Sequence, residues 1–343
     1  MNRAKPFRVA INGYGRIGQC VLRALYENGY RDHLQVVAIN ELSDIDTIAH
    51  LTRYDSTHGR FQGEVSVDGS DLVVNGDHIR VLRHADPEDL PWGLLDVDLV
   101  LECSGSFSDR AMAEKHLDSG AKRLLFSQPA ESDVDRTVVF GVNEADLDAS
   151  DRIVAAASCT TNCLVPVIHE LDRAFGVEQG STTTIHAAMN DQPVIDAYHH
   201  QDLRRTRSAL HNIVPVDTGL ARGIERLLPA MKGKFSSVAM RVPTLNVSAI
   251  DMVVNVREST DVTSVNSLLQ QAAHGSLKGI LGYTDELLAS SDFNHDAHSG
   301  VVDGGQTRVT GGTMVKVLCW FDNEWGFANR MLDVSRCWLG KTE

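Results

Sequence analysis

The chain has 343 residues, more than one hydrophobic core usually supports, so we expect two domains. Hydrophobic residues at 43% and charged residues at 23% are typical of a globular protein in aqueous solution. The net charge of −14 argues against nucleic acid or an acidic membrane surface as a partner, although local arginines can still bind an anionic substrate.

The first apolar run, Phe7–Asn12, predicts a buried strand that leads directly into a glycine-rich turn. That turn has the spacing GxGxxG, with Gly13, Gly15 and Gly18 at its three positions, and Gln19–Asn28 after it predicts a helix. In a dinucleotide-binding turn, such glycines permit a tight bend, close approach of the pyrophosphate and close helix packing. The GxGxxG spacing alone is a weak signal of a dinucleotide site, so support for that site has to come from the next strand.

That second strand, Gln35–Asn40, ends at the acidic residue Glu41. An acid at this place accepts hydrogen bonds from both ribose hydroxyls and repels a 2′-phosphate, so the sequence favours NAD over NADP as cofactor. Apolar runs that start at Val97 and Arg123 predict further strands, with the helical stretch Asp109–Ser119 between them. Strands that alternate with helices predict a doubly wound, Rossmann-type α/β cofactor domain.

Cys159 lies where a strand-like run, 153–157, gives way to a helix-like run, Leu164–Phe175. A sulfur at the N-terminus of a helix is close to unpaired N–H groups and to the positive end of the helix dipole. We therefore expect the pKa of this thiol to fall by one or more units below about 8.5, which would make it a nucleophile. Pro166 leaves two alternatives open: either the helix starts later, or it is kinked.

The second half of the chain has longer strand-like runs with helical pieces between them. This pattern predicts an α+β catalytic domain with a mostly antiparallel or mixed sheet. The expected strands are Ser181–His186, Ser236–Val242, Val247–Val256 and Val315–Phe321, and the expected helices are Ser264–Ala273 and Glu324–Trp338.

The segment 187–215 has little periodicity, and a loop of that length is usually functional or lies at an interface. It contains three arginines close to two histidines: Arg204, Arg205, Arg207, His199 and His200.

A thiol nucleophile in a chain with a dinucleotide site points to oxidation of an aldehyde. Cys159 would add to the carbonyl carbon, the cofactor would accept a hydride, and water or phosphate would release the product from a thioester. His186 is the candidate base for the thiol, and with the Cys159 backbone N–H it would hold the oxyanion. A substrate phosphate is expected to bind a set of basic, hydroxyl and backbone groups: Ser158, Thr160, Arg205, Thr218, Gly219 and Arg241.

Four motifs follow one another along the chain: residues 12–18 (NGYGRIG), 157–163 (ASCTTNC), 241–244 (RVPT) and 320–326 (WFDNEWG). Together they resemble the glyceraldehyde-3-phosphate dehydrogenase family, and the similarity covers essentially the whole chain. The resemblance implies that Cys159 is the nucleophile and His186 its activator. It also implies five residues at the cofactor: Arg16, Ile17, Glu41, Ser127 and Asn323.

The same resemblance implies a homotetramer in which residues 187–215 pack near a neighbour's cofactor site. It implies an NAD-binding domain formed by residues 1–158 and 323–343, and a catalytic domain formed by residues 159–322.

Several positions depart from the glycolytic members of the family and resemble the branch that oxidises D-erythrose 4-phosphate. Met189 stands where the family usually has a threonine that binds the substrate phosphate, and a thioether cannot donate a hydrogen bond. Residues 200–207 and 292–299 also differ from the glycolytic form. This branch implies NAD-dependent oxidation to 4-phosphoerythronate with water, in pyridoxal phosphate biosynthesis.

Two alternatives stay open: the phosphorylating glyceraldehyde-3-phosphate dehydrogenase of glycolysis, and an NAD-binding regulator with a vestigial site. Ala85 stands where we expect an arginine near the adenine, which puts that cofactor contact in doubt.

Six cysteines, none of them in a CxxC pair, predict reduced thiols and neither a disulfide framework nor a metal site. The sequence shows no secretory signal pattern and no apolar run of about 18 residues. We expect a cytoplasmic enzyme whose partners are a phosphorylated aldose and further copies of the same chain.

Overall fold

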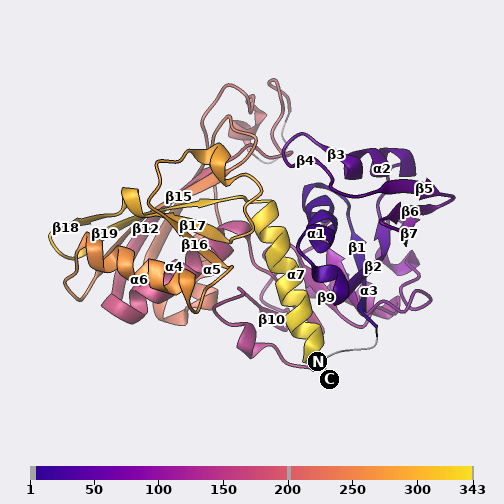
Figure 1. Ribbon diagram of the computed structural model, residues 1–343, viewed down its shortest axis with the longest axis horizontal. Helices are drawn as coiled ribbons and strands as arrows, with labels where there is room; N and C mark the ends of the chain where they lie inside the picture. The colour runs from indigo at the N-terminus through magenta and orange to yellow at the C-terminus, as the bar shows by residue number, and fades with distance from the viewer. Residues whose placement is uncertain (1–4, 199–201, 342–343) are drawn as a thin grey trace. The chain divides into compact units, whose positions relative to one another are not determined.

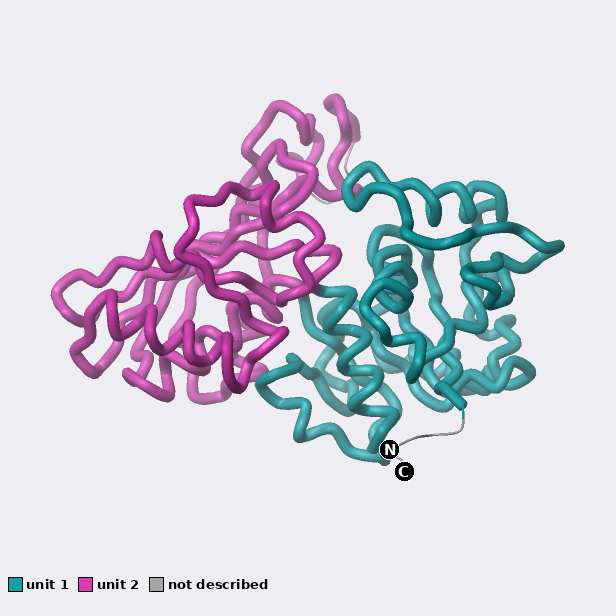
Figure 2. The backbone as a smooth tube through the Cα atoms, viewed as in Figure 1, with its two compact units in different colours: residues 1–158, 327–343 teal, residues 159–326 magenta. Residues whose placement is uncertain are grey.

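The computed structural model describes residues 5–198 and 202–341, and Figure 1 shows their elements in chain order. Two compact units are formed, Met1–Ser158 with Phe327–Glu343 (unit 1) and Cys159–Gly326 (unit 2), as Figure 2 shows. The histidine pair expected beside the arginines, His199 and His200, lies outside the described residues. The assignment of NAD binding to residues 1–158 and 323–343, and of catalysis to 159–322, stays a prediction.

Unit 1 is built on a sheet with the strand order β10-β11-β9-β8-β1-β2-β7-β6-β5. Its strands are β1 (Phe7–Asn12), β2 (Leu34–Asn40), β5 (Val65–Asp68), β6 (Asp71–Val74), β7 (Asp77–Leu82), β8 (Leu99–Glu102), β9 (Leu124–Phe126), β10 (Arg136–Thr137) and β11 (Ile153–Ala155). The pairings from β10 to β7 are parallel, whereas β6 and β5 form an antiparallel edge.

The order runs outward from β1 in both directions, which makes this sheet doubly wound. Helix α1 (Arg16–Glu27) joins β1 to β2, and helix α3 (Arg110–Asp118) joins β8 to β9 on the other side. Since such crossovers are right-handed, α1 and α3 cover opposite faces of the sheet. The Rossmann-type cofactor domain expected from the sequence is confirmed.

Unit 1 has further helices and strands outside this sheet. They are α2 (Ile45–Arg53), the short pair β3 (Tyr54–Asp55) and β4 (Gly59–Arg60), and the part of α7 (Trp325–Gly340) that follows Gly326. Val9, Ala10 and Ile11 of β1 are each 0% exposed, as expected for a central parallel strand covered on both faces.

Unit 2 holds a mixed sheet with the order β13-β14-β12-β15-β19-β17-β16, and β18 pairs with β19 at its edge. Its strands are β12 (Val177–His186), β13 (Val214–Val216), β14 (Phe235–Arg241), β15 (Ser248–Val256), β16 (Leu281–Thr284), β17 (Gly300–Asp303), β18 (Arg308–Thr310) and β19 (Met314–Phe321). The β12–β14 and β16–β17 pairs are parallel and the other pairings are antiparallel, so the predicted mixed sheet is confirmed.

Three helices accompany this sheet: α4 (Cys159–Phe175), α5 (Leu220–Leu227) and α6 (Val262–His274). Helix α4 packs on β12, β15, β17 and β19 and contacts the other two helices. On β12 the side chains of Thr182, Thr184 and His186 are buried, and their alternate positions put them on one face of the strand.

Helix α4 begins at Cys159 and continues through Pro166. The alternative in which the helix starts after Cys159 is therefore wrong. Because proline removes one intrahelical hydrogen bond, the buried apolar residues around it stabilise the helix in its place. Among the described residues, no helix is both long enough and apolar enough to cross a membrane.

Candidate active site

Cys159 is the first residue of α4, where backbone N–H groups lack partners within the helix. His186 is the last residue of β12. Its Nε2 lies 4.0 Å from the Cys159 sulfur, and its Nδ1 lies 2.8 Å from the Ala187 carbonyl oxygen. Because that carbonyl can only accept, Nδ1 carries the proton in the neutral ring, and Nε2 is left as the acceptor facing the thiol.

Burial determines the protonation states of Cys159 and His186. It raises the pKa of the Cys159 thiol to about 11, although the Thr160 N–H and the charge of Arg241 oppose that rise. Burial, followed by the charge of Arg241, lowers the pKa of His186 to about 4. The expected fall of the thiol pKa is therefore not seen, because loss of solvation outweighs the helix N–H groups. At neutral pH the resting pair is a thiol beside a neutral imidazole.

Arg241 ends β14 directly beside His186, its partner in the parallel register of β12 and β14. Its Nη1 atom is buried and makes no hydrogen bond to any described residue. Burial lowers the pKa of this guanidinium, but arginine stays charged in proteins. A half-buried cation with one buried, unused donor is suited to an anion close to the thiol and imidazole.

Arg205, in the short 3₁₀ helix Leu203–Thr206, is held by two carboxylates. Its Nη1 donates to Asp191 Oδ2 at 3.0 Å, and its Nε lies 3.5 Å from Asp202 Oδ2. Arg205 lines a cavity of about 370 Å³ together with Asp202, Arg204, Pro215, Val216 and Asp217. The guanidinium assigned to the substrate phosphate thus lies beside two carboxylates, but its Nε atom is buried and makes no hydrogen bond to any described residue.

The remaining residues expected at the substrate lie next to these groups in the chain. Ser158 and Thr160 flank Cys159, and Thr160 is buried. Thr218 and Gly219 follow the cavity wall formed by 215–217, and the Thr218 hydroxyl accepts from the Leu220 N–H at 3.3 Å at the start of α5. The structure places Arg241 with the Cys159–His186 pair, and Arg205 beside the strand that leads to Thr218.

Unit 1 contains a second cavity, of about 300 Å³, at the carboxyl ends of β1, β2 and β8. It is lined by Asn12, Gly13, Gly15, Asn40, Glu41, Leu42, His84, Ala85, Pro87, Cys103, Ser104, Ser106 and Phe107. Because the strand order reverses between β1 and β8, this is the crevice in which doubly wound sheets bind ligands.

The three glycines of the first turn meet three different requirements of that crevice. Gly13 has φ +87°, and a Cβ there would lie 2.4 Å from the Ser104 Cα. A Cβ on Gly18 would lie 2.4 Å from the Gly13 carbonyl oxygen, so the helix packs tightly on the turn. Nothing lies within 4 Å of the position a Cβ would take on Gly15, which leaves room for a ligand against the backbone. These residues fit a dinucleotide pyrophosphate at the start of α1.

Other residues expected at the cofactor also have contacts within unit 1. Glu41 accepts from the Tyr14 N–H at 2.9 Å and from the Leu42 N–H at 2.8 Å, so it also braces the glycine turn. Arg16, in the first turn of α1, makes a bidentate ion pair with Asp55. Ile17 is half-buried beside it, and Ser127 follows β9 with its N–H donated to the Glu102 carbonyl at 3.0 Å.

In unit 2, Asn323 follows β19 and accepts a hydrogen bond from the Ser248 hydroxyl at 2.8 Å. The same hydroxyl accepts from the Ala187 N–H at 3.0 Å. Ser248 therefore connects Asn323 to the residue whose carbonyl orients His186.

Sequence reasoning missed three acidic groups near these sites: Asp191 at Arg205, Asp55 at Arg16, and Glu324, whose charge raises the pKa values of both Cys159 and His186. The only signal for Asp191 is an acid in an otherwise weakly patterned segment. That signal does not specify its partner.

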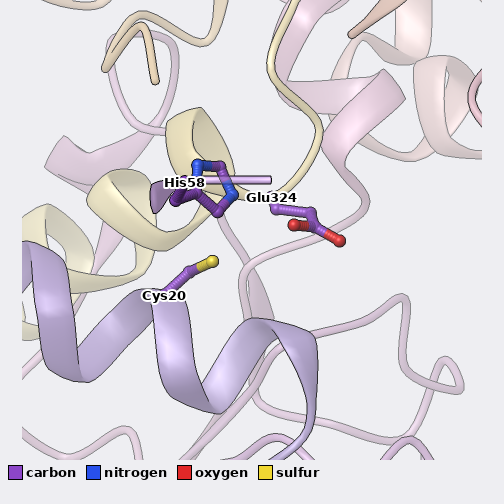
Figure 3. A group of neighbouring side chains, drawn as sticks. All are labelled: Cys20, His58 and Glu324. Atoms are coloured by element: carbon purple, nitrogen blue, oxygen red, sulfur yellow. The ribbon is translucent and has the colours of Figure 1, made fainter. Parts of the chain in front are cut away.

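A cysteine and a histidine also meet away from the crevice of unit 1. Figure 3 shows Cys20 on α1 with its sulfur toward His58, and a ring nitrogen of His58 lies within 4.8 Å of that sulfur. Glu324, drawn in the same view, belongs to unit 2. Two ligands from one unit are fewer than a structural metal site needs, so we assign no metal to them.

Comparison with family models agrees with the two units. Residues 7–110 match the model described as glyceraldehyde 3-phosphate dehydrogenase, NAD binding domain. Residues 158–323 match the model described as glyceraldehyde 3-phosphate dehydrogenase, C-terminal domain.

Proposed function

Because this chain belongs to the glyceraldehyde-3-phosphate dehydrogenase family, we propose that it oxidises D-erythrose 4-phosphate to 4-phosphoerythronate. Family membership makes it an NAD-dependent oxidoreductase that acts on a sugar-phosphate aldehyde. The observation that carries the proposed chemistry is the Cys159 sulfur 4.0 Å from a His186 Nε2 that is kept free as an acceptor.

The first step of the proposed reaction is addition of Cys159 to the aldehyde. The sulfur forms a bond to the carbonyl carbon while His186 Nε2 takes the thiol proton. The new oxyanion is held by the Cys159 backbone N–H and by the imidazolium. NAD, when bound, would supply the acceptor for the hydride that leaves the thiohemiacetal carbon. The imidazolium first gives its proton to the oxyanion, His186 takes it back from this hydroxyl as the hydride leaves, and the product is a thioester on Cys159.

Water then attacks the thioester carbon, the C–S bond breaks, and the sulfur leaves with the bonding electrons. His186, having released its earlier proton to solvent, accepts a proton from the attacking water and returns it to Cys159. Arg241, with a buried donor unused, is the group we propose for the phosphate of the substrate.

Met189 supports a four-carbon substrate over a three-carbon one. Its side chain is 44% exposed and offers no donor where the family usually has a threonine. A phosphate that loses this contact depends more on the arginines, so its position shifts and a longer substrate is accommodated. We place this activity in pyridoxal phosphate biosynthesis. The scattered cysteines suggest reduced thiols, so we place the enzyme in the cytoplasm.

The segment 187–215 supports a homo-oligomer, which we propose to be a tetramer. It exposes several large apolar side chains: Val194, Ile195, Tyr198, Leu203, Leu210 and Ile213. Apolar groups gathered in one exposed segment are typical of a protein contact.

Product analysis tests the proposed function. Purified protein with erythrose 4-phosphate and NAD in phosphate-free buffer should form 4-phosphoerythronate, identified by NMR, together with an equal amount of NADH. Cys159→Ala should form neither. An acyl phosphate as the product, or turnover only when inorganic phosphate is added, would contradict the hydrolytic reaction and favour the phosphorylating alternative.

Substitution of Met189 tests the assignment of substrate length. Met189→Thr restores a donor and should move the ratio of kcat/KM for the four-carbon over the three-carbon aldehyde toward the shorter substrate by roughly tenfold, the worth of one hydrogen bond to a charged group. Met189→Leu, which adds no donor, is the control. An unchanged ratio in Met189→Thr would move specificity to residues 198–207.

A further inference from the structure

A row of buried polar side chains crosses the sheet of unit 1 at the cofactor crevice. Glu102, Asn12 and Asn40 are the last residues of β8, β1 and β2, and the parallel register places them side by side. They are 1%, 4% and 7% exposed. Burial of a carboxylate costs stability unless the group is paired and hydrogen-bonded, so Glu102 is expected to hold several donors.

The Glu102 carboxylate connects the strand before the glycine turn with the segment after β8. Its Oε2 accepts from Asn12 Nδ2 at 2.6 Å, and its Oε1 accepts from the N–H and the hydroxyl of Ser104. The Ser104 hydroxyl accepts in turn from the Ser106 N–H at 3.1 Å. Asn12 precedes Gly13, where a Cβ would lie 2.4 Å from the Ser104 Cα. One side chain thus holds together two segments that pack closely in the crevice.

A buried histidine of α3 faces the same carboxylate. His116, which is 1% exposed, accepts at Nδ1 from Trp92 Nε1 at 3.0 Å. Because an indole N–H only donates, the proton of the neutral imidazole is on Nε2. That Nε2 lies 3.4 Å from Glu102 Oε2 without the alignment of a hydrogen bond, so the contact is electrostatic. Each of these neighbours presents a donor to Glu102, which suits an ionised carboxylate.

A carboxylate that only accepts also fixes the orientation of the amides in the row. The Asn12 NH₂ group faces Glu102, so its Oδ1 is turned to Asn40, whose Nδ2 donates to it at 2.8 Å. Asn40 then presents its own Oδ1 to the His84 N–H at 2.9 Å. Asn12, Asn40 and His84 all line the crevice. The polar groups of the crevice are therefore oriented from the Glu102 end of the row.

We propose that Glu102 is a positioning residue for NAD and acts on the cofactor through Asn12 and Ser104. Its carboxylate holds the glycine turn against Ser104 and sets the direction of the Asn12 and Asn40 amides, so the crevice is ordered before NAD arrives. Such preorganisation raises affinity, because binding does not have to order these groups. The inference rests on the NAD-binding domain and holds whichever aldehyde the enzyme oxidises.

Glu102→Gln tests the inference, because an amide of nearly the same shape has one acceptor oxygen in place of two. Its NH₂ group must face either the Asn12 amide or the Ser104 N–H, so at least one hydrogen bond of the row is lost. The Kd for NADH, measured by fluorescence titration without aldehyde, should rise about tenfold. The KM for NAD should rise with it, while kcat at saturating NAD stays within about twofold of wild type, since Cys159 and His186 lie in unit 2.

The direction of the change separates positioning from simple electrostatics. Glu102→Gln removes a negative charge beside a crevice suited to an anionic pyrophosphate, which by itself would strengthen binding. Weaker binding therefore reports the loss of positioning. Glu102→Asp keeps the charge and both acceptor oxygens on a shorter side chain, so its Kd should lie between those of wild type and Glu102→Gln.

Asp151→Asn is the matched control, because the Asp151 carboxylate is also buried in unit 1 but pairs with Arg136 at 2.8 Å, outside the row. It should lower the melting temperature and leave the Kd for NADH near the wild-type value. Binding by Glu102→Gln that is as tight as wild type or tighter, or equal weakening in Asp151→Asn, would overturn the inference. If Glu102→Gln does not fold, Glu102→Asp decides: a rise in Kd of about threefold or more supports the inference, and an unchanged Kd overturns it.

Discussion

Single hydrogen bonds control the candidate base. The Ala187 carbonyl, 2.8 Å from His186 Nδ1, selects the ring tautomer, and the Ala187 N–H is held in turn by the Ser248 hydroxyl. The sulfur at 4.0 Å from Nε2 is at the long end of a hydrogen bond to sulfur. Such contacts commonly shorten when a substrate binds, so the pair is arranged for proton transfer during addition to an aldehyde.

Replacement of His186 should slow oxidation without loss of cofactor. In His186→Asn the thiol has no base, so the rate of acylation should fall by a factor on the order of 10²–10⁴. Single-turnover NADH formation measures this step, and NAD affinity should stay near the wild-type value. A variant that kept the wild-type rate would remove His186 from the mechanism.

The pH dependence of thiol alkylation reports the resting charge of the pair. Burial raises the pKa of Cys159 to about 11 and lowers that of His186 to about 4, so the thiolate forms only as pH rises above neutrality. Iodoacetamide should therefore label Cys159 with a midpoint above the value of about 8.5 for a free thiol. Peptide mass spectrometry separates Cys159 from the other cysteines. A midpoint near pH 6 would indicate a thiolate–imidazolium pair at rest.

The nucleophile and base could be proposed from sequence because each stands beside a recognisable boundary of an element. Their acidic neighbours could not. Asp191 meets Arg205 fourteen positions away, and Asp55 meets Arg16 across thirty-nine, through folds of the chain that no local pattern encodes. The thiol pKa was mispredicted for a related reason, because burial is a tertiary property.

At the scale of elements, the turn between β1 and α1 offers a matched pair of substitutions. Gly13→Ala forces a side chain into φ +87° and into the backbone of Ser104, so it should lower both thermal stability and NAD affinity. Gly15→Ala meets nothing within 4 Å, so its melting temperature should stay near wild type while NAD binding weakens. Calorimetry and fluorescence titration measure the two quantities. Equal losses of stability in both variants would contradict the difference between the close packing at Gly13 and the open space at Gly15.

The long buried strands were predictable within a residue or two, since continuous apolar runs define β1, β2, β15 and β19. The antiparallel edge β5–β7 was not anticipated, because its half-buried strands alternate polar and apolar residues over only a few positions. Helix α2 was also missed. Pro166 argues locally for a break that the buried helix overrides, so the local sequence does not specify where α4 starts.

At the scale of the whole molecule, one ion pair should give stability a defined pH dependence. The Asp55 side chain is 1% exposed. Its burial favours a higher pKa, but hydrogen bonds from Arg16, His58 and Thr57 and the charge of Arg16 hold the pKa well below its usual range. A depressed carboxyl pKa contributes stability above the unfolded value of 3.8, and this contribution is lost as pH falls through the folded value.

Asp55→Asn should therefore destabilise the protein by about 2 kcal/mol at neutral pH, with a difference in melting temperature that shrinks below about pH 4. Thermal melts of wild-type and Asp55→Asn apoprotein, from neutral pH to below about pH 4, measure this difference in melting temperature. Asp96→Asn is the control, because the pair of Asp96 with Lys122 is mostly exposed and should matter little. A constant difference at all pH values would contradict the role of the Asp55 charge.

The central claim is tested most directly by the initial rate of NADH formation from erythrose 4-phosphate and from glyceraldehyde 3-phosphate, each with and without inorganic phosphate. We predict a higher kcat/KM for the four-carbon aldehyde and a rate that does not depend on phosphate. A far higher kcat/KM for glyceraldehyde 3-phosphate, seen only when phosphate is present, would contradict the account and make this chain a phosphorylating enzyme.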